Sequence, residues 1–221
     1  ILQSSYIDEN SLYFCSRYGF ITASDRNFYR LYQKNIDWNK LKGYSNNKSS
    51  EEGVTLKYFQ YVPDEILEEF CRVYSACGRM APDYDGDFVA AEQITPESVR
   101  RDDEYCRKNG YVKLNMISVE KDGSISGVTD MGYDTSDPKV VNQGLTGVLT
   151  DYRGRGVGLW LKSAILFKLK ENDPEFEYIE TGNNKSNAAM LAINEKLGYV
   201  RHSSHALVTA KVEDVMERLK E

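Results

Sequence analysis

The sequence has few histidines and cysteines, the residues that form structural zinc sites and disulfide frameworks. Its 221 residues include two histidines, His202 and His205, and four cysteines with no C-x-x-C pair. A structural zinc site needs about four ligands at short spacings, and disulfide-rich domains carry a much higher density of cysteine. We therefore expect no metal cofactor, and we interpret the cysteines as the reduced thiols of a cytoplasmic protein.

The sequence also lacks an excess of positive charge and a long apolar run. The formal net charge is -6 and the isoelectric point is near 5.2. Nucleic acids and anionic lipid surfaces select for clustered Lys and Arg, so we expect no nucleic-acid partner. No apolar run approaches the roughly 18 residues of a membrane-spanning helix, so we expect no membrane partner either. A cationic or neutral small substrate fits this charge better.

The chain does contain enough apolar material for a folded core. Hydrophobic residues make up 41% of the sequence and aromatic residues 12%, and 221 residues allow one large domain or one domain and part of another. The wholly polar run 45–52 lacks the apolar surface needed to order itself. We therefore divide the chain into a segment at 1–40, a linker at 41–53 and a domain at 54–221.

Two stretches of the sequence resemble each other. When Gly19 is aligned with Gly198, SLYFCSRYGFITASDRNFYRLY lies beside MLAINEKLGYVRHSSHALVTAK, and each runs through a helix, a glycine, an aromatic residue and a strand. We interpret 1–40 as the end of a preceding copy of the domain; a chance likeness between two short helix-to-strand joins is the alternative. The chain begins at Ile1 and not at a methionine, and we expect it to be part of something longer.

Hydrophobic periodicity predicts strands and helices between residues 54 and 221. Strands are expected at 54–62, 111–120, 124–133, 139–150, 178–181 and 205–210, and helices at 64–77, 96–109, 159–171, 187–197 and from 212 onward. Asp122-Gly123 suits the tight turn of a hairpin. Gly144 and Gly147 lie inside an expected strand, where such glycines mark a bulge or the close approach of a ligand.

A glycine-rich loop, Arg153 to Gly158, stands between a predicted strand and a predicted helix. The first N–H groups of a helix have no internal partner and its dipole favours an anion, while glycines let backbone amides approach phosphate oxygens. A nucleotide-hydrolase P-loop would need a glycine where Leu161 stands, and a dinucleotide fingerprint would need one at Leu159. The loop therefore predicts a pyrophosphate site of another kind.

The loop fits the pattern R-x-x-G-x-G, and VLTDYRGRGVGLWLK together with ETGNNKSNAAMLAINEKLGY resembles the GNAT N-acetyltransferase superfamily. The element order from 54 to 210 is similar to that of the family, and the segment 1–40 makes the chain similar to tandem, mycothiol synthase-like acetyltransferases. The resemblance implies an α/β (α+β) fold with a GNAT-like mixed, mostly antiparallel central sheet, a parallel splayed strand pair and helices on both faces. It also implies acetyl-CoA as the cosubstrate.

The resemblance assigns residues to the coenzyme. It implies that the backbone of Val148, Leu149 and Thr150 holds the pantetheine arm beside the splay. The pyrophosphate is expected on the amides of Arg153, Gly154, Arg155, Gly156, Val157, Gly158 and Leu159, with the two arginines supplying charge. Further coenzyme contacts are expected beyond the splay at Asn183, Asn187 and Asn194. For Asn187, an ordinary helix cap is an equally open alternative.

Proton transfer needs an acid and a base. Many family members carry a tyrosine at the position of Asn194, where it protonates the leaving thiolate, and an amide has no proton to give at neutral pH. The acid would then be water or another residue such as Tyr133. For the base we favour Glu180, followed by Asp130 and Asp134; solvated rim carboxylates are the alternative interpretation of all three.

These observations together predict an acetyl-CoA-dependent N-acetyltransferase. It would act on an amine of a small molecule by direct attack, without a covalent cysteine intermediate. Two alternatives stay open, namely a coenzyme-binding module that serves as a sensor or structural half, and acetylation of a protein or peptide amine. The partner arrangement that we expect is a homodimer or the completion of the partial N-terminal copy.

Overall fold

The computed structural model describes residues 2–7, 9–45, 53–81, 93–172 and 175–220. In these residues eight strands form one sheet in the order β1-β8-β2-β7-β6-β5-β4-β3, and only the β6–β7 pair is parallel. The strands are β1 (Leu2–Ile7), β2 (Ile21–Tyr32), β3 (Thr55–Phe59), β4 (Tyr111–Val119), β5 (Ile125–Asp134), β6 (Asp137–Val148), β7 (Tyr178–Asn184) and β8 (Val200–Ala210). The helices are α1 (Glu9–Arg17), α2 (Trp38–Ser45), α4 (Leu67–Arg79), α5 (Pro96–Asn109), α6 (Val157–Glu171), α7 (Ala188–Leu197) and α8 (Val212–Arg218). The predicted mixed, mostly antiparallel sheet is confirmed.

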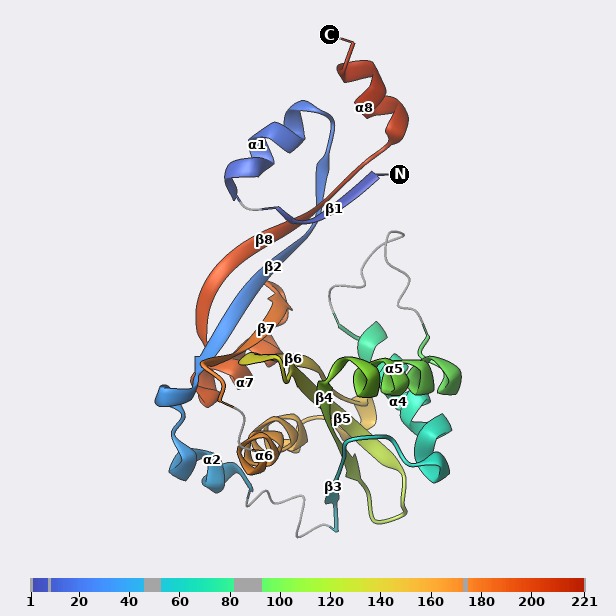
Figure 1. Cartoon of the computed structure of the whole chain (residues 1–221), viewed down its shortest axis with the longest axis vertical. Helices are drawn as coiled ribbons and strands as arrows, with labels where there is room; N and C mark the ends of the chain where they lie inside the picture. The colour runs from blue at the N-terminus through green and yellow to red at the C-terminus, as the bar shows by residue number, and fades with distance from the viewer. Residues whose placement is uncertain (1, 8, 46–52, 82–92, 173–174, 221) are drawn as a thin grey trace.

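Helices cover both faces of the sheet (Figure 1). Side chains alternate along β4, so that Leu114 and Met116 join the core under α6, while Ile117 and Val119 join the core under α4. α2 lies against α6, and α5 contacts β4 and α4. Within the described parts of the chain, every helix falls short of the length and apolar character that a bilayer crossing demands.

A bulge interrupts β6, as its two internal glycines predicted. Gly144 and Leu145 together lie opposite Asp130 alone. A Cβ on Gly144 would meet the Asp130 carboxylate, and a Cβ on Gly147 would lie 2.5 Å from the Cβ of Cys77. A side chain at either position would therefore collide with a protein side chain.

The N-terminal segment belongs to the same sheet as the rest of the chain. β2 lies between β7 and β8, and β1 pairs with the other edge of β8. In Figure 1 the long β2–β8 ribbon carries β1, α1 and α8 away from the body of the molecule, and we call this projecting part the arm. The division at residue 54 therefore does not separate two sheets, because β2 occupies a central position among strands of the C-terminal part.

The unit β1-α1-β2 matches the unit β7-α7-β8 at the spacing of the sequence alignment. α1 and α7 are each followed by a glycine with positive φ, Gly19 at +82° and Gly198 at +92°. Arg26 and His205, which the alignment makes equivalent, are register partners in the antiparallel β2–β8 pair. An approximate two-fold axis between these two residues therefore relates the two units.

The linker predicted at 41–53 begins later than expected. Its first residues belong to α2, in which Leu41 is 2% exposed and packs in the α6 core. Trp38, at the start of α2, lies against Phe167 of α6 with ring centroids 5.5 Å apart. These apolar contacts order a helix where a linker was predicted. Residues 46–52 lie outside the described part of the chain.

Candidate coenzyme and acceptor site

The predicted phosphate loop forms the entrance to α6. Gly154 and Gly156 have φ values of +80° and +75°, in the left-handed region that favours glycine. The helix begins at Val157, slightly before the predicted start at 159, and Gly156 provides no side-chain cap. The first turn holds no acidic residue. Its N–H groups are therefore open to an anion.

A cavity of about 600 Å³ opens in front of this helix start. Its walls come from β6, the loop, the start of α6 and the start of α7. The predicted coenzyme residues that line it are Val148, Arg153, Gly154, Gly156, Val157, Gly158, Leu159 and Asn187. On β6 the wall is formed by residues 145–148.

Five predicted coenzyme residues lie outside this wall, namely Leu149, Thr150, Arg155, Asn183 and Asn194. The Leu149 N–H already donates to the Ser126 carbonyl at 2.9 Å, and Thr150 opens a short 3-10 turn. The chain has thus left the cavity by the end of β6. Of the three residues predicted for the pantetheine arm, Val148 therefore lines the cavity, whereas Leu149 and Thr150 do not.

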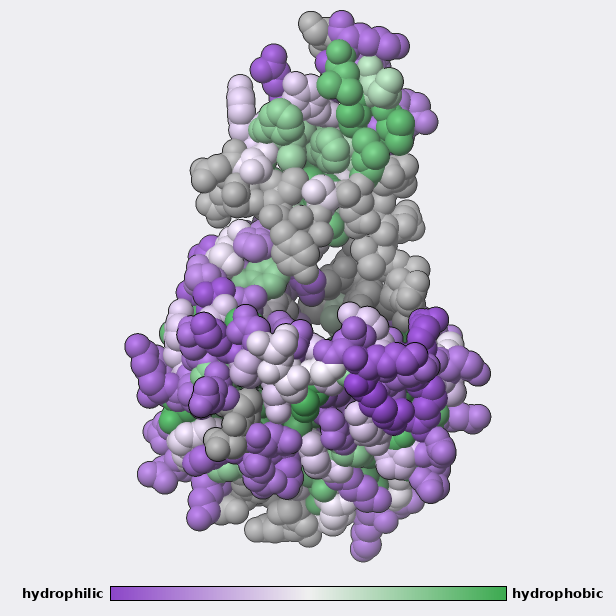
Figure 2. Space-filling view, in the orientation of Figure 1, coloured by the Kyte–Doolittle hydropathy of each residue, from purple (hydrophilic) through white to green (hydrophobic). Residues whose placement is uncertain are grey.

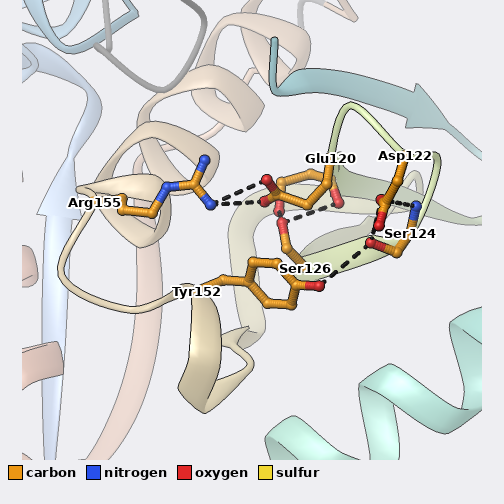
Figure 3. Close-up of polar contacts among 7 residues, drawn as sticks. Glu120, Asp122, Ser124, Ser126, Tyr152 and Arg155 are labelled. Carbon is orange, nitrogen blue, oxygen red and sulfur yellow. Dashed lines mark hydrogen bonds and ion pairs between the residues drawn. The ribbon is translucent and has the colours of Figure 1, made fainter. Parts of the chain in front are cut away.

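The side chains of the two loop arginines have different surroundings. Arg155 Nη1 lies 3.0 and 3.1 Å from the two carboxylate oxygens of Glu120, at the end of β4 (Figure 3). Arg153 lines the cavity, and its Nε donates to the Val148 carbonyl at 3.0 Å. In this structure Arg153 is therefore the loop arginine that faces the cavity, and the charge of Arg155 is matched by Glu120.

Cys77 is part of the cavity wall. All four cysteines are free and buried. Burial raises the pKa of the Cys77 thiol to about 11, with Arg153 acting in the opposite direction. A protonated thiol is a poor nucleophile at neutral pH. The thiol of Cys77 is therefore not suited to act as a nucleophile.

β6 and β7 pair over a short stretch and then diverge. Parallel pairing joins residues 140–142 to 178–180 and stops there within the described residues. A second cavity, of about 400 Å³, occupies the gap. The Gln143 Oε1 atom is buried in its wall with no hydrogen-bond partner among the described residues. The two cavities share the wall residues Ala81, Leu145, Thr146, Asn187 and Met190. The predicted splay therefore joins one cavity to the other.

Glu180, the first candidate base, lines the second cavity. The Arg30 Nε donates to its carboxylate at 2.8 Å, and the same guanidinium lies 4.0 Å from the ring centroid of Tyr178. Arg30 stands on β2, 150 residues away in the chain. The counter-ion of this carboxylate was missed because it depends on where β2 enters the sheet.

Asp130, the second candidate, reaches the second cavity through Tyr74. The Tyr74 hydroxyl lines that cavity and donates to Asp130 Oδ1 at 2.9 Å. The Leu145 N–H donates to the same oxygen at 2.9 Å. Burial raises the pKa of Asp130 to about 6, against the effect of these two hydrogen bonds. A carboxyl that titrates close to neutral pH beside a cleft is suited to proton transfer.

The remaining proton-transfer candidates lie apart from both cavities. Asp134 accepts hydrogen bonds from the hydroxyl and the N–H of Ser136, which lower its pKa and hold the β5–β6 turn. Tyr133 is buried in the core on the α6 side of the sheet, and burial raises the pKa of its phenol. The geometry does not support Tyr133 as the acid, because its side chain packs in the core and lines neither cavity.

Three asparagines predicted beyond the splay have distinct places. Asn187 caps α7 by accepting the Met190 N–H at 3.2 Å, and it also lines both cavities, so the cap and the ligand roles are compatible. Asn183 lines the second cavity. Asn194 is 1% exposed and donates to Asn183 Oδ1 at 2.7 Å. Asn194 therefore supports the wall and lines neither cavity.

Lys162 is the site residue that the sequence did not predict. It is 1% exposed, lines the second cavity, and donates through Nζ to the amide oxygen of Asn194. Burial lowers the pKa of Lys162 to about 7. The signal that could have found it is the apolar run LWLKSAILF, in which a lysine interrupts the buried face of α6.

The chain has the fold of the GCN5-related N-acetyltransferases. It is similar to a tandem GNAT protein from the clavulanic acid biosynthesis pathway, with a TM-score of 0.73 and 20% identity over 94% of this chain and 62% of that one. It is also similar to a GCN5-related N-acetyltransferase from Sphaerobacter thermophilus, with a TM-score of 0.65 and 17% identity over 94% and 59%. The chain thus spans less than two thirds of either protein. No protein-family model and no curated protein matches its sequence.

Proposed function

We propose that the chain is an N-acetyltransferase that uses acetyl-CoA as cosubstrate and an amine of a small molecule as acceptor. One observation carries the proposal: the cavity at the start of α6 meets the cavity between β6 and β7 at a shared wall. A coenzyme in the first cavity would therefore present its thioester to an amine in the second. The four free cysteines support a reducing, cytoplasmic location.

The coenzyme would be held mainly by backbone groups. The N–H groups from Gly154 to Leu159 are suited to the pyrophosphate, with Arg153 adding positive charge. The edge of β6 that diverges from β7 would offer backbone groups to the pantetheine arm within residues 145–148. Gly147 lets α4 pack close to this strand, because a side chain there would collide with Cys77.

Transfer would proceed by direct attack of the amine nitrogen on the thioester carbonyl. The cavity between β6 and β7 would hold the acceptor, and we call it the acceptor cavity. Glu180 is the carboxylate that lines it and is our candidate to accept the proton of the amine. Tyr74 and Asp130 offer a second route for that proton. Holding the thioester and the amine next to each other at the shared wall would itself account for much of the rate enhancement.

Coenzyme binding is tested by isothermal titration calorimetry with acetyl-CoA. Gly156→Asp puts a carboxylate in front of the open helix start and is expected to weaken binding by at least about 100-fold, since it repels the pyrophosphate. Gly43→Asp is the matched control, because nothing lies within 4 Å of an added Cβ in α2. Gly43→Asp should bind like the parent chain. Equal binding by Gly156→Asp would overturn the proposal.

A coenzyme-binding module without turnover, used as a sensor or structural half, is the second candidate. Asn194 favours it, because its amide has no proton to give and is already engaged by Lys162 and Asn183. A free-thiol release assay over small amines and lysine-containing basic peptides separates the cases. Release with small amines supports the enzyme proposal, and release with peptides alone supports a peptide acceptor. Binding without release on any acceptor supports the module.

We further propose that the arm binds a second coenzyme-binding body of the same fold. The approximate two-fold axis between Arg26 and His205 relates β1-α1-β2 to β7-α7-β8. The unit β7-α7-β8 is itself packed on a body of this fold. The arm carries exposed apolar side chains, including Phe14 of α1 at 64% and Met216 of α8 at 53% exposure. Figure 2 shows the apolar colour gathered on the arm. Covering this surface would remove apolar area from water.

A further inference from the structure

Lys162 is an ammonium group buried without an ion-pair partner among the described residues. Its Nζ donates to the Asn194 amide oxygen and lies 3.9 Å from Met190 Sδ. The centroid of the Tyr199 ring is 4.8 Å from the same nitrogen. Burying a charge with so few polar partners opposes folding, so packing alone does not explain a lysine at this position.

The same nitrogen lies next to the wall that the two cavities share. Lys162 lines the acceptor cavity, and Met190, which its Nζ contacts, lines both cavities. A thioester that extends from the α6 cavity toward an amine between β6 and β7 has to pass this shared wall. A thioester sulfur at this wall would face the cavity that Lys162 lines.

The groups around Lys162 leave its proton available at neutral pH. Burial lowers the pKa of Lys162 to about 7 and raises that of the neighbouring Tyr199 phenol, which stays neutral. The other titratable or charged groups on this core and on the two cavities include Tyr133, Arg26, Arg153, Lys196, and Glu180 with its partner Arg30. Asn194 and Asn183 are uncharged and hold the nitrogen in place.

We propose that the ammonium of Lys162 protonates the coenzyme sulfur as it leaves, an inference that rests on the acetyl transfer proposed above. The amine nitrogen forms a bond to the carbonyl carbon, the carbon–sulfur bond breaks with its electron pair on sulfur, and sulfur takes a proton from Nζ. The attacking nitrogen loses one proton to Glu180 and then to water, and Lys162 regains one from water. The products are the amide and the free thiol. Asn194 is then a positioning residue.

The test is single-turnover thiol release by K162M and K162R against pH. K162M removes the proton and the charge with little change in volume and is expected to be about 100-fold slower near neutral pH. The parent rate should fall as pH rises through about 7, and K162M should lack this descending limb. K162R keeps the charge but gives up no proton at neutral pH, so it should be as slow as K162M. A fast K162R, or the parent's descending limb in K162M, overturns the proposal.

A second measurement needs no turnover. Free coenzyme A is bound to the parent and to K162M, and thiolate absorbance is followed against pH with desulfo-coenzyme A as the blank. An ammonium beside the sulfur stabilises the thiolate, so the bound thiol should titrate at lower pH in the parent. If the bound thiol titrates at the same pH in the parent and in K162M, the proposed role of Lys162 is wrong, while the proposed coenzyme site is not contradicted. Failure of the parent to bind coenzyme A would overturn the proposed function, and this inference with it.

The fold of each variant is checked by urea unfolding at several pH values. The pKa of Lys162 is lowered in the folded chain, so between about 7 and its ordinary value of 10.5 the unfolded chain binds more protons. The stability of the parent relative to K162M should therefore rise with pH across this window. A difference that stays flat would show that Lys162 is solvated in the folded chain, which contradicts the proposal.

Discussion

At the scale of single residues, position in the fold decides what equivalent-looking side chains do. Arg153 and Arg155 stand two apart in one loop, yet Arg153 lines the cavity at the start of α6 and Arg155 is held by Glu120. The spacing of the loop predicted the open helix start correctly, because that depends on local backbone and glycine. It could not predict the partner of Arg155, which comes from the end of β4, 35 residues away.

Substitution of the two arginines tests this difference. Arg153→Gln is expected to weaken acetyl-CoA binding about 10-fold, since a charge-assisted hydrogen bond to phosphate is lost. Arg155→Gln should change binding by less than about threefold, but it should lower the free energy of unfolding by about 1 kcal/mol because a partly buried ion pair is broken. Calorimetry measures the first quantity and urea unfolding the second. Equal losses of affinity in the two variants would contradict the assignment.

Catalytic candidates show the same limit of local patterns. Glu180 was predicted and lies on the acceptor cavity, but its partner Arg30 was not. Lys162 was missed because a lysine within a helix is usually solvated, and only the packing of α6 against the sheet shows that it is buried. Tyr133 was named for its chemistry, and the alternation of side chains along β5 turns it into the core.

At the scale of elements, strong local signals gave the correct structure. α5 begins at a capping box formed by Thr95 and Ser98 and ends at Gly110 with φ of +69°. β7 runs to Asn184, past the predicted end at 181, because its last residues pair with β2. β8 begins at Val200, before the predicted start at 205, for the same reason. The end of β7 and the start of β8 were misplaced because each depends on pairing with β2, which is distant in the sequence.

The central place of β2 leads to a prediction for the fragment 54–221. Without the N-terminal segment, β7 and β8 lose the strand between them and α6 loses the cover of α2. The fragment is expected to show no cooperative urea transition by tryptophan fluorescence, and a peptide of residues 1–45 added in trans should restore it. Leu31 of β2 is 0% exposed, so a Leu31→Asp peptide should fail to restore it. Cooperative unfolding of the fragment alone, at the parent's midpoint, would contradict this role.

At the scale of the whole molecule, the arm is the part whose surface does not suit exposure to water. β1 is the last strand at its end of the sheet, with no further strand paired to it in the described residues. Phe14 and Tyr13 of α1 and Met216 of α8 expose more than half of their surface. An unpaired strand edge beside apolar side chains favours association. The approximate two-fold axis supports a body of the same fold as the partner that covers them.

The chain of residues 1–221 is therefore expected to self-associate reversibly through the arm. Phe14→Ser combined with Met216→Ser should raise the dissociation constant at least about 10-fold, because two apolar side chains no longer leave water on association. Tyr105→Ser is the matched control, since Tyr105 is 64% exposed but lies on α5, outside the arm. Sedimentation equilibrium over a range of concentrations measures the dissociation constant of the parent, the double variant and Tyr105→Ser. If the parent stays monomeric throughout, or if Tyr105→Ser shifts the equilibrium as far as the double variant, the arm does not dock a second body, and its apolar side chains need another explanation.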